Sequence, residues 1–233
     1  MAERSTIGVG IVGFGFMGRT HLAAYQAAAR EGWPCEVLAV CDGDPESVAQ
    51  VRQCGEAGMG HSLDSTRTRM CENFDEMLSN DRVKLVSICT YTDSHVDLAI
   101  RALDAGKHVL VEKPVALRSR DVQRLCEATA RSDRRCMPAM CMRFWPGWDW
   151  LIGCITAGSL GPVRNAAFTR LGSGPIWASD FYRDVSRSGG AMFDLHIHDA
   201  DFILACLKTP RAVSSTGSVN HVKTLYKFSD GPS

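Results

Sequence analysis

The sequence has no excess of either charge, no long apolar run and no paired-cysteine motif. Its 26 basic residues balance 26 acidic ones, so no basic surplus argues for a nucleic-acid partner or a membrane surface. No apolar stretch approaches the roughly 18 residues of a membrane-spanning helix. The first ten residues lack the charged-then-apolar pattern of a signal peptide, and we expect a cytoplasmic protein.

Cysteine is frequent, but its spacing is irregular. None of the ten cysteines forms C-x-x-C, so we interpret them as reduced, mostly buried thiols, with a zinc site as the alternative. At 233 residues, of which 45% are apolar and 22% charged, the chain has room for one or two globular domains.

The pattern G-x-G-x-x-G occurs twice in GVGIVGFGFMGRTH, residues 8–21, once from Gly8 and once from Gly13. The motif must follow a strand and open a helix. Residues 6–12 form a short β-branched run, and helix formers follow Gly15. The second copy therefore meets the requirement, while the first two glycines lie within or beside the strand.

Each glycine of the second copy has a predicted role. Gly13 makes the tight turn, Gly15 lets the backbone approach a pyrophosphate, and Gly18 permits close helix packing. The helix N-terminus attracts the anion. A turn built for packing alone is the alternative. The predicted cofactor-binding turn includes the intervening residues Phe14, Phe16 and Met17.

A carboxylate follows the second predicted strand, residues 36–41. Asp42 lies where the adenosine ribose hydroxyls of NAD are bound in this type of fold, and it would repel the extra phosphate of NADP. We therefore expect NAD rather than NADP. The alternative is that Asp42 only caps its own turn.

Strands and helices continue to alternate, which predicts a parallel sheet wound on both faces. Strands are expected at 84–89, 108–111 and 135–140, and helices at 94–105 and 118–131. Ligands bind at the carboxyl ends of such strands. Thr90, Thr92 and Glu112-Lys113-Pro114 all lie at these ends and should face the cofactor.

Lys113 is the first candidate for proton transfer. Pro114 restricts its backbone, and a lysine near a positive nicotinamide ring suits the role of proton acceptor. The alternative is an exposed lysine in a turn.

The pattern changes after Arg143. We expect a strand at 163–171, a helix at 191–207 and strands at 213–219 and 222–228. The last strand runs into Asp230-Gly231, a hairpin signal without a second strand, so we expect a truncated sheet.

Within the helix expected at 191–207, Asp194, His198 and Asp201 fall on one stripe. A carboxylate beside an imidazole can orient it for proton transfer. The alternatives are a capped helix with surface histidines, or a metal pair, for which no third ligand is evident. His196 is expected to be structural.

These residues resemble the glucose–fructose oxidoreductase/inositol dehydrogenase (Gfo/Idh/MocA) family. The resemblance covers nearly the whole chain. Its carriers are GFGFMG (13–18), Asp42, SICTYTDSHVDLAIRALDAGKHVLVEKPVA (87–116), MRFWP (142–146) and GGAMFDLHIHDADF (189–202). Where the family has T-P-N, this sequence reads T-D-S at 92–94.

The resemblance implies an α/β fold: an N-terminal Rossmann domain (1–142), followed by a partial α+β domain (143–233) with an open, mainly antiparallel sheet that is truncated. It implies that Lys113, Asp194 and His198 are catalytic. It also implies that Thr90 and Thr92 line the cofactor and that His95 lies near the nicotinamide. Glu112 is counted among the cofactor-binding residues as well.

The implied function is an NAD(P)-dependent dehydrogenase acting on a secondary alcohol of a sugar, polyol or cyclic diol. We expect a small-molecule substrate, no nucleic-acid or membrane partner and no metal, with a homo-oligomer allowed if the C-terminal sheet is complete. The alternatives are a nucleotide-binding protein without turnover and an NAD-assisted glycosidase.

Overall fold

The chain forms two compact units, Met1–Ala139 and Met140–Ser233. The computed structural model describes residues 6–44, 63, 66–171 and 179–228. Within those ranges, no helix combines the length and the apolar character needed to cross a membrane.

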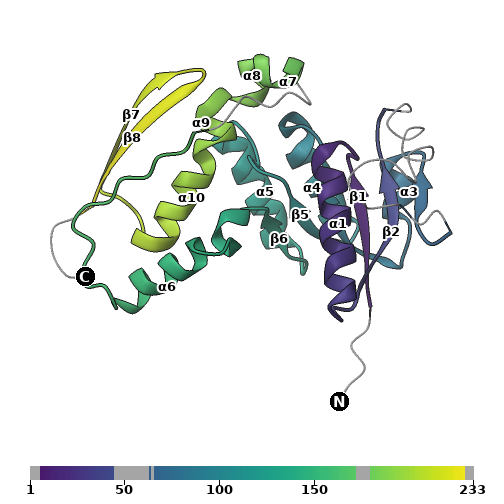
Figure 1. Cartoon of the computed structure of the whole chain (residues 1–233). Helices are drawn as coiled ribbons and strands as arrows, with labels where there is room; N and C mark the ends of the chain where they lie inside the picture. The colour runs from purple at the N-terminus through teal and green to yellow at the C-terminus, as the bar shows by residue number, and fades with distance from the viewer. Residues whose placement is uncertain (1–5, 45–62, 64–65, 172–178, 229–233) are drawn as a thin grey trace. The chain divides into compact units, whose positions relative to one another are not determined.

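The first unit is built on a parallel sheet, of which Figure 1 labels β1, β2, β5 and β6. The strand order of the sheet is β3-β2-β1-β4-β5-β6. All five pairings are parallel, and the chain reverses its direction of winding between β1 and β4. This order is that of a doubly wound dinucleotide-binding sheet, so the predicted fold class is confirmed. The strands are β1 (Ile7–Val12), β2 (Cys35–Cys41), β3 (Arg69–Cys71), β4 (Val83–Ile88), β5 (His108–Val111) and β6 (Cys136–Pro138).

Helices cover both faces of this sheet. On one face Leu22 of α1 packs with Val9 and Ile11 of β1. On the other face α3, α4 and α5 pack against Val12 and its neighbours. The alternation of side chains along β1 serves both cores. The helical elements are α1 (Phe16–Arg30), α3 (Phe74–Leu78), η1 (Thr92–Ser94), α4 (His95–Asp104) and α5 (Ser119–Arg131).

The second unit combines short helices with an antiparallel hairpin. Trp148, Phe168 and Phe202 form its aromatic cluster, with ring centroids 4.6–6.0 Å apart. The two strands of the hairpin pair with each other. The elements are η2 (Cys141–Phe144), α6 (Trp148–Ala157), α7 (Ser179–Arg183), α8 (Val185–Ser188), α9 (Gly190–Asp194), α10 (His196–Leu207), β7 (Ala212–Ser218) and β8 (His221–Lys227).

Two predicted elements of this unit are wrong. Residues 163–171 form no strand, because a strand needs a neighbour and the described strands of the unit, β7 and β8, pair only with each other. The helix predicted at 191–207 is interrupted at Leu195, whose carbonyl accepts a bond from His198 N–H three residues on. The hairpin signal at Asp230-Gly231 lies outside the described residues.

Candidate active site

The two copies of the glycine pattern have different environments. Gly8 and Gly10 lie inside β1, where side chains would not fit. A Cβ at Gly8 would be 2.1 Å from the carbonyl oxygen of Arg82, and one at Gly10 would be 2.6 Å from Sδ of Met77. These glycines serve core packing, and the second copy forms the turn between β1 and α1, as predicted.

Two glycines of the turn are required by its shape. Gly13 has a φ of +82°, and a Cβ there would lie 2.7 Å from the backbone of Cys89 and Thr90. A Cβ at Gly18 would lie 2.1 Å from the carbonyl oxygen of Gly13. The first turn of α1 is therefore pressed directly onto the loop that precedes it.

Gly15 is different, because a Cβ there would meet nothing within 4 Å. It is the N-cap of α1, it offers no side-chain cap, and the first turn carries no acidic residue. The N–H groups at a helix start carry partial positive charge and favour an anion. Open space beside this helix start fits a phosphate group that approaches the backbone closely.

Asp42 joins the end of β2 to this turn. One carboxylate oxygen accepts from the N–H of Phe14 at 2.5 Å, and the other accepts from the N–H of Asp44 at 2.9 Å. The capping role that we considered as an alternative is thus present. An ionised carboxylate has about four acceptor positions, so capacity remains for ribose hydroxyls.

The segment after β4 is tied to the segment after β5 by His95. This side chain is 1% exposed, and its ring nitrogens lie 3.0 Å from the carbonyl oxygen of Thr90 and 2.9 Å from that of Pro114. Burial lowers the pKa of His95, although the two carbonyls oppose this effect. Both ring nitrogens are engaged by the protein.

The two predicted threonines differ in exposure. Thr92 is buried at the start of η1. Thr90 is half-buried, and its hydroxyl accepts from Ser94 Oγ at 2.7 Å. Both follow the carboxyl end of β4, at the same end of the sheet as the glycine turn.

Glu112 directly follows β5, and its backbone extends the ladder by donating to Ile88 O at 2.9 Å. Its side chain is buried; one carboxylate oxygen contacts His21 Nε2 at 2.9 Å and the other accepts from the N–H of Lys113 at 3.0 Å. Burial acts to raise the pKa of Glu112, but the interactions with His21 and with Lys113, including the hydrogen bond from the Lys113 amide, together outweigh it, and the pKa is lowered. Glu112 is therefore an ionised carboxylate that fixes the backbone of the half-buried Lys113.

His21 is the residue in this unit that the sequence analysis missed. Its other nitrogen, Nδ1, contacts Ser87 Oγ at 3.1 Å, and Ser87 contacts the hydroxyl of Tyr25 at 2.9 Å. Two signals were present: a polar serine among the buried residues of β4, and a histidine and tyrosine four residues apart on one face of α1.

In the second unit the predicted stripe is divided. Asp194 ends α9, whereas His198 and Asp201 belong to α10. Asp201 binds Arg143 through two bonds of 2.7 and 2.5 Å. The prediction that one continuous helix carries all three residues is thus wrong, because α9 and α10 are separate helices.

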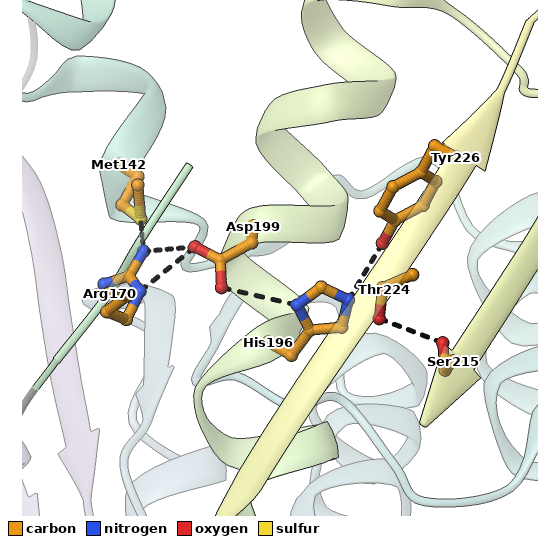
Figure 2. Close-up of polar contacts among 7 residues, drawn as sticks. All are labelled: Met142, Arg170, His196, Asp199, Ser215, Thr224 and Tyr226. Carbon is orange, nitrogen blue, oxygen red and sulfur yellow. Dashed lines mark hydrogen bonds and ion pairs between the residues drawn. The ribbon is translucent and has the colours of Figure 1, made fainter. Parts of the chain in front are cut away.

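A row of polar contacts links three segments of the second unit. Figure 2 shows Arg170 bound to Asp199, Asp199 to His196, and His196 to Tyr226 of β8. Burial acts to raise the pKa of Asp199, but the interactions with His196 and Arg170 outweigh this effect, so the pKa is lowered overall. Arg170 also contacts Met142. His196, expected to be structural, thus ties α10 to the hairpin.

Comparison with known proteins identifies both parts of the chain. Residues 7–140 match the model of an oxidoreductase family with an NAD-binding Rossmann fold, and residues 151–229 match the GFO/IDH/MocA C-terminal domain. The chain belongs to this oxidoreductase family. The resemblance drawn from its motifs is therefore confirmed.

Individual members of the family are moderately similar to this chain in sequence. An uncharacterized oxidoreductase of Rhizobium meliloti, ORF334, is 32% identical over 81% of this chain and 54% of its own length. An inositol 2-dehydrogenase of Rhizobium meliloti (strain 1021) is 29% identical over 92% of this chain and 59% of its own length. A crystal structure of an NAD-binding protein from Listeria innocua has a TM-score of 0.74 and 26% identity, covering 92% of this chain and 59% of that one. This chain spans about half the length of the curated relatives it matches.

Proposed function

We propose that the protein binds NAD at the β1–α1 turn and transfers a hydride between this cofactor and a secondary alcohol of a sugar, polyol or cyclic diol. The observation that carries the proposal is the open space at Gly15, at an N-terminus without a side-chain cap and beside the Asp42 carboxylate. Packing alone requires no glycine at this position, whereas a close phosphate does.

Binding would be divided among three strand ends. The backbone of Gly13 to Gly18 would hold the pyrophosphate, and Asp42 the adenosine ribose. Thr90 and Thr92 would line the nicotinamide half. Since a carboxylate at the ribose repels an added phosphate, we propose a preference for NAD over NADP.

Bound NAD supplies a ring that accepts or returns a hydride at C4. In the oxidation direction the carbinol carbon would give up its hydrogen as the hydride, and His198 would take up the hydroxyl proton. We propose that Lys113 polarises the substrate oxygen and that Asp194 orients the imidazole. The buried carboxylate of Glu112 supports the role of Lys113, because it fixes the lysine backbone through the amide.

The substrate class is supported by the kinship with inositol 2-dehydrogenases, one of which is 29% identical over 92% of this chain. Polyols with ring hydroxyls are therefore the first compounds to test.

The test is an absorbance assay for reduced nicotinamide with NAD or NADP and a panel of inositols and sugars. We expect reduction of NAD by at least one polyol, and a fall of about 10²–10⁴-fold in kcat for Lys113→Met with NADH affinity retained. Binding without any reduction would favour the nucleotide-binding alternative. Sugar release without net reduction would favour the glycosidase. Turnover by Lys113→Met within a few fold of the parent would contradict the assigned role.

A further inference from the structure

A buried row of polar side chains connects the middle of α1 to the residue before Lys113. Tyr25, Ser87, His21 and Glu112 follow one another with separations of 2.9, 3.1 and 2.9 Å. His21 and Glu112 side chains are only 11% and 8% exposed. The row ends where Glu112 accepts the backbone N–H of Lys113.

The donors and acceptors available satisfy every link in the row. The Glu112 carboxylate can only accept, so Nε2–H of His21 donates to it. Nδ1 of His21 bonds to the Ser87 hydroxyl, which in turn bonds to the Tyr25 hydroxyl. Each buried polar group has a partner, as a rigid network requires.

We propose that His21 is a positioning residue for Lys113. It holds the Glu112 carboxylate, the carboxylate holds the lysine amide, and the lysine is thereby fixed relative to α1. This inference rests on the proposed function, in which the start of the same helix binds the pyrophosphate. The row therefore ties the proposed cofactor site to Lys113 through the side chains of His21 and Glu112.

The physical reason is the burial of the carboxylate. A buried charge needs a partner, and Glu112 has His21 and one backbone amide. Without the imidazole, the carboxylate must take up a proton or turn toward water. A protonated carboxyl accepts more weakly from the amide of Lys113, and a carboxylate turned toward water no longer accepts from it. In either case the Lys113 segment is held less firmly, and the backbone bond of Glu112 to Ile88 and the contact of His95 with Pro114 remain.

Three variants separate positioning from general support. His21→Leu removes both ring nitrogens at similar volume. His21→Gln keeps an amide donor near the place of Nε2, so it should retain the link to Glu112. Thr20→Ala is the matched control, since this exposed neighbour on α1 donates to the carbonyl oxygen of Phe16 outside the row.

The main readout is the rate at which an acylating reagent labels Lys113 in the apo protein, measured by peptide mass spectrometry against the exposed Lys223. We expect His21→Leu to raise the relative rate at least about threefold through local opening, with parental rates in His21→Gln and Thr20→Ala. For any polyol that the parent oxidises, kcat should fall by about 10–100-fold in His21→Leu while the KM for NAD is nearly unchanged.

An unchanged labelling rate in His21→Leu would overturn the inference, and so would an equal change in His21→Gln. If His21→Leu does not fold, His21→Asn replaces it, because its shorter amide can reach Ser87 but not Glu112. The labelling comparison needs neither NAD nor substrate. Failure of the parent to bind NADH or oxidise polyols would therefore refute the proposed function without touching this result.

Discussion

Replacement of Gly15 by alanine should separate folding from cofactor binding. The added methyl group meets nothing within 4 Å, and Gly15 has a φ of −69°, which any residue adopts. Loss of glycine flexibility in the unfolded chain stabilises by about 0.4–1 kcal/mol. Alanine is a poorer N-cap than glycine, at a cost of about the same size. The two effects oppose each other, so the free energy of unfolding should change by less than about 1 kcal/mol.

The same methyl group would occupy the space proposed for the pyrophosphate. A hydrogen bond between a backbone amide and a charged group contributes about 1.5–3 kcal/mol. Loss of one such bond corresponds to a weakening of about tenfold to hundredfold. We therefore expect NADH to bind Gly15→Ala at least about tenfold more weakly than the parent.

The assay is a fluorescence titration with NADH, combined with urea unfolding of the same preparations. Gly153→Ala is the matched control, since Gly153 lies within α6 and a Cβ there also meets nothing within 4 Å. This control should gain up to about 1 kcal/mol of stability and keep its NADH affinity. Parental NADH affinity in a folded Gly15→Ala variant would refute the assignment of the phosphate site.

Three further substitutions test other parts of the account. Gly18→Ala places a methyl group 2.1 Å from the carbonyl oxygen of Gly13, so urea unfolding should show a loss of about 1–3 kcal/mol, and unchanged stability would contradict the packing argument. Asp42→Asn removes a repulsion of about 1 kcal/mol or more, so the ratio of NADPH to NADH affinity should rise at least about fivefold in titrations; a constant ratio would count against Asp42 as the selector. The lowered pKa of Glu112 contributes stability that is fully present above the usual value of 4.5 and is lost as the pH falls through the folded value. Urea unfolding from about pH 7 to about pH 3 should therefore show a weaker acid dependence in Glu112→Gln than in the parent, and parallel curves would exclude this contribution.

The turn and its helix were predictable because their signals are local. A β-branched run, three glycines and a series of helix formers succeed one another over residues 6–30, and the structure places β1, the turn and α1 there. Repeated alternation of strands and helices then leaves few topologies for the sheet.

Contacts between distant segments were not predictable in the same way. Residues 163–171 have strand-forming composition, but only a neighbouring strand could have held them in a sheet. The two helices on either side of Leu195 are held by partners far along the chain. Ala191 of α9 donates its N–H to the carbonyl oxygen of Val219, and His196 of α10 contacts Tyr226. Periodicity within 191–207 carries no information about these partners.

The row through His21 shows the same limit within the site. Its members come from α1, β4 and the end of β5, and their sequence separations reach 91 residues. Ser87 among the apolar residues at the end of β4 was a visible signal, but its partner His21 is brought to it only by the packing of α1 on the sheet.

The most direct test is a crystal structure of the protein grown with NAD. The account predicts the pyrophosphate within hydrogen-bonding distance of the backbone amides at the start of α1, the adenosine ribose on the Asp42 carboxylate, and Nζ of Lys113 facing the nicotinamide. A dinucleotide bound elsewhere, or a lysine directed away from the ring, would contradict it.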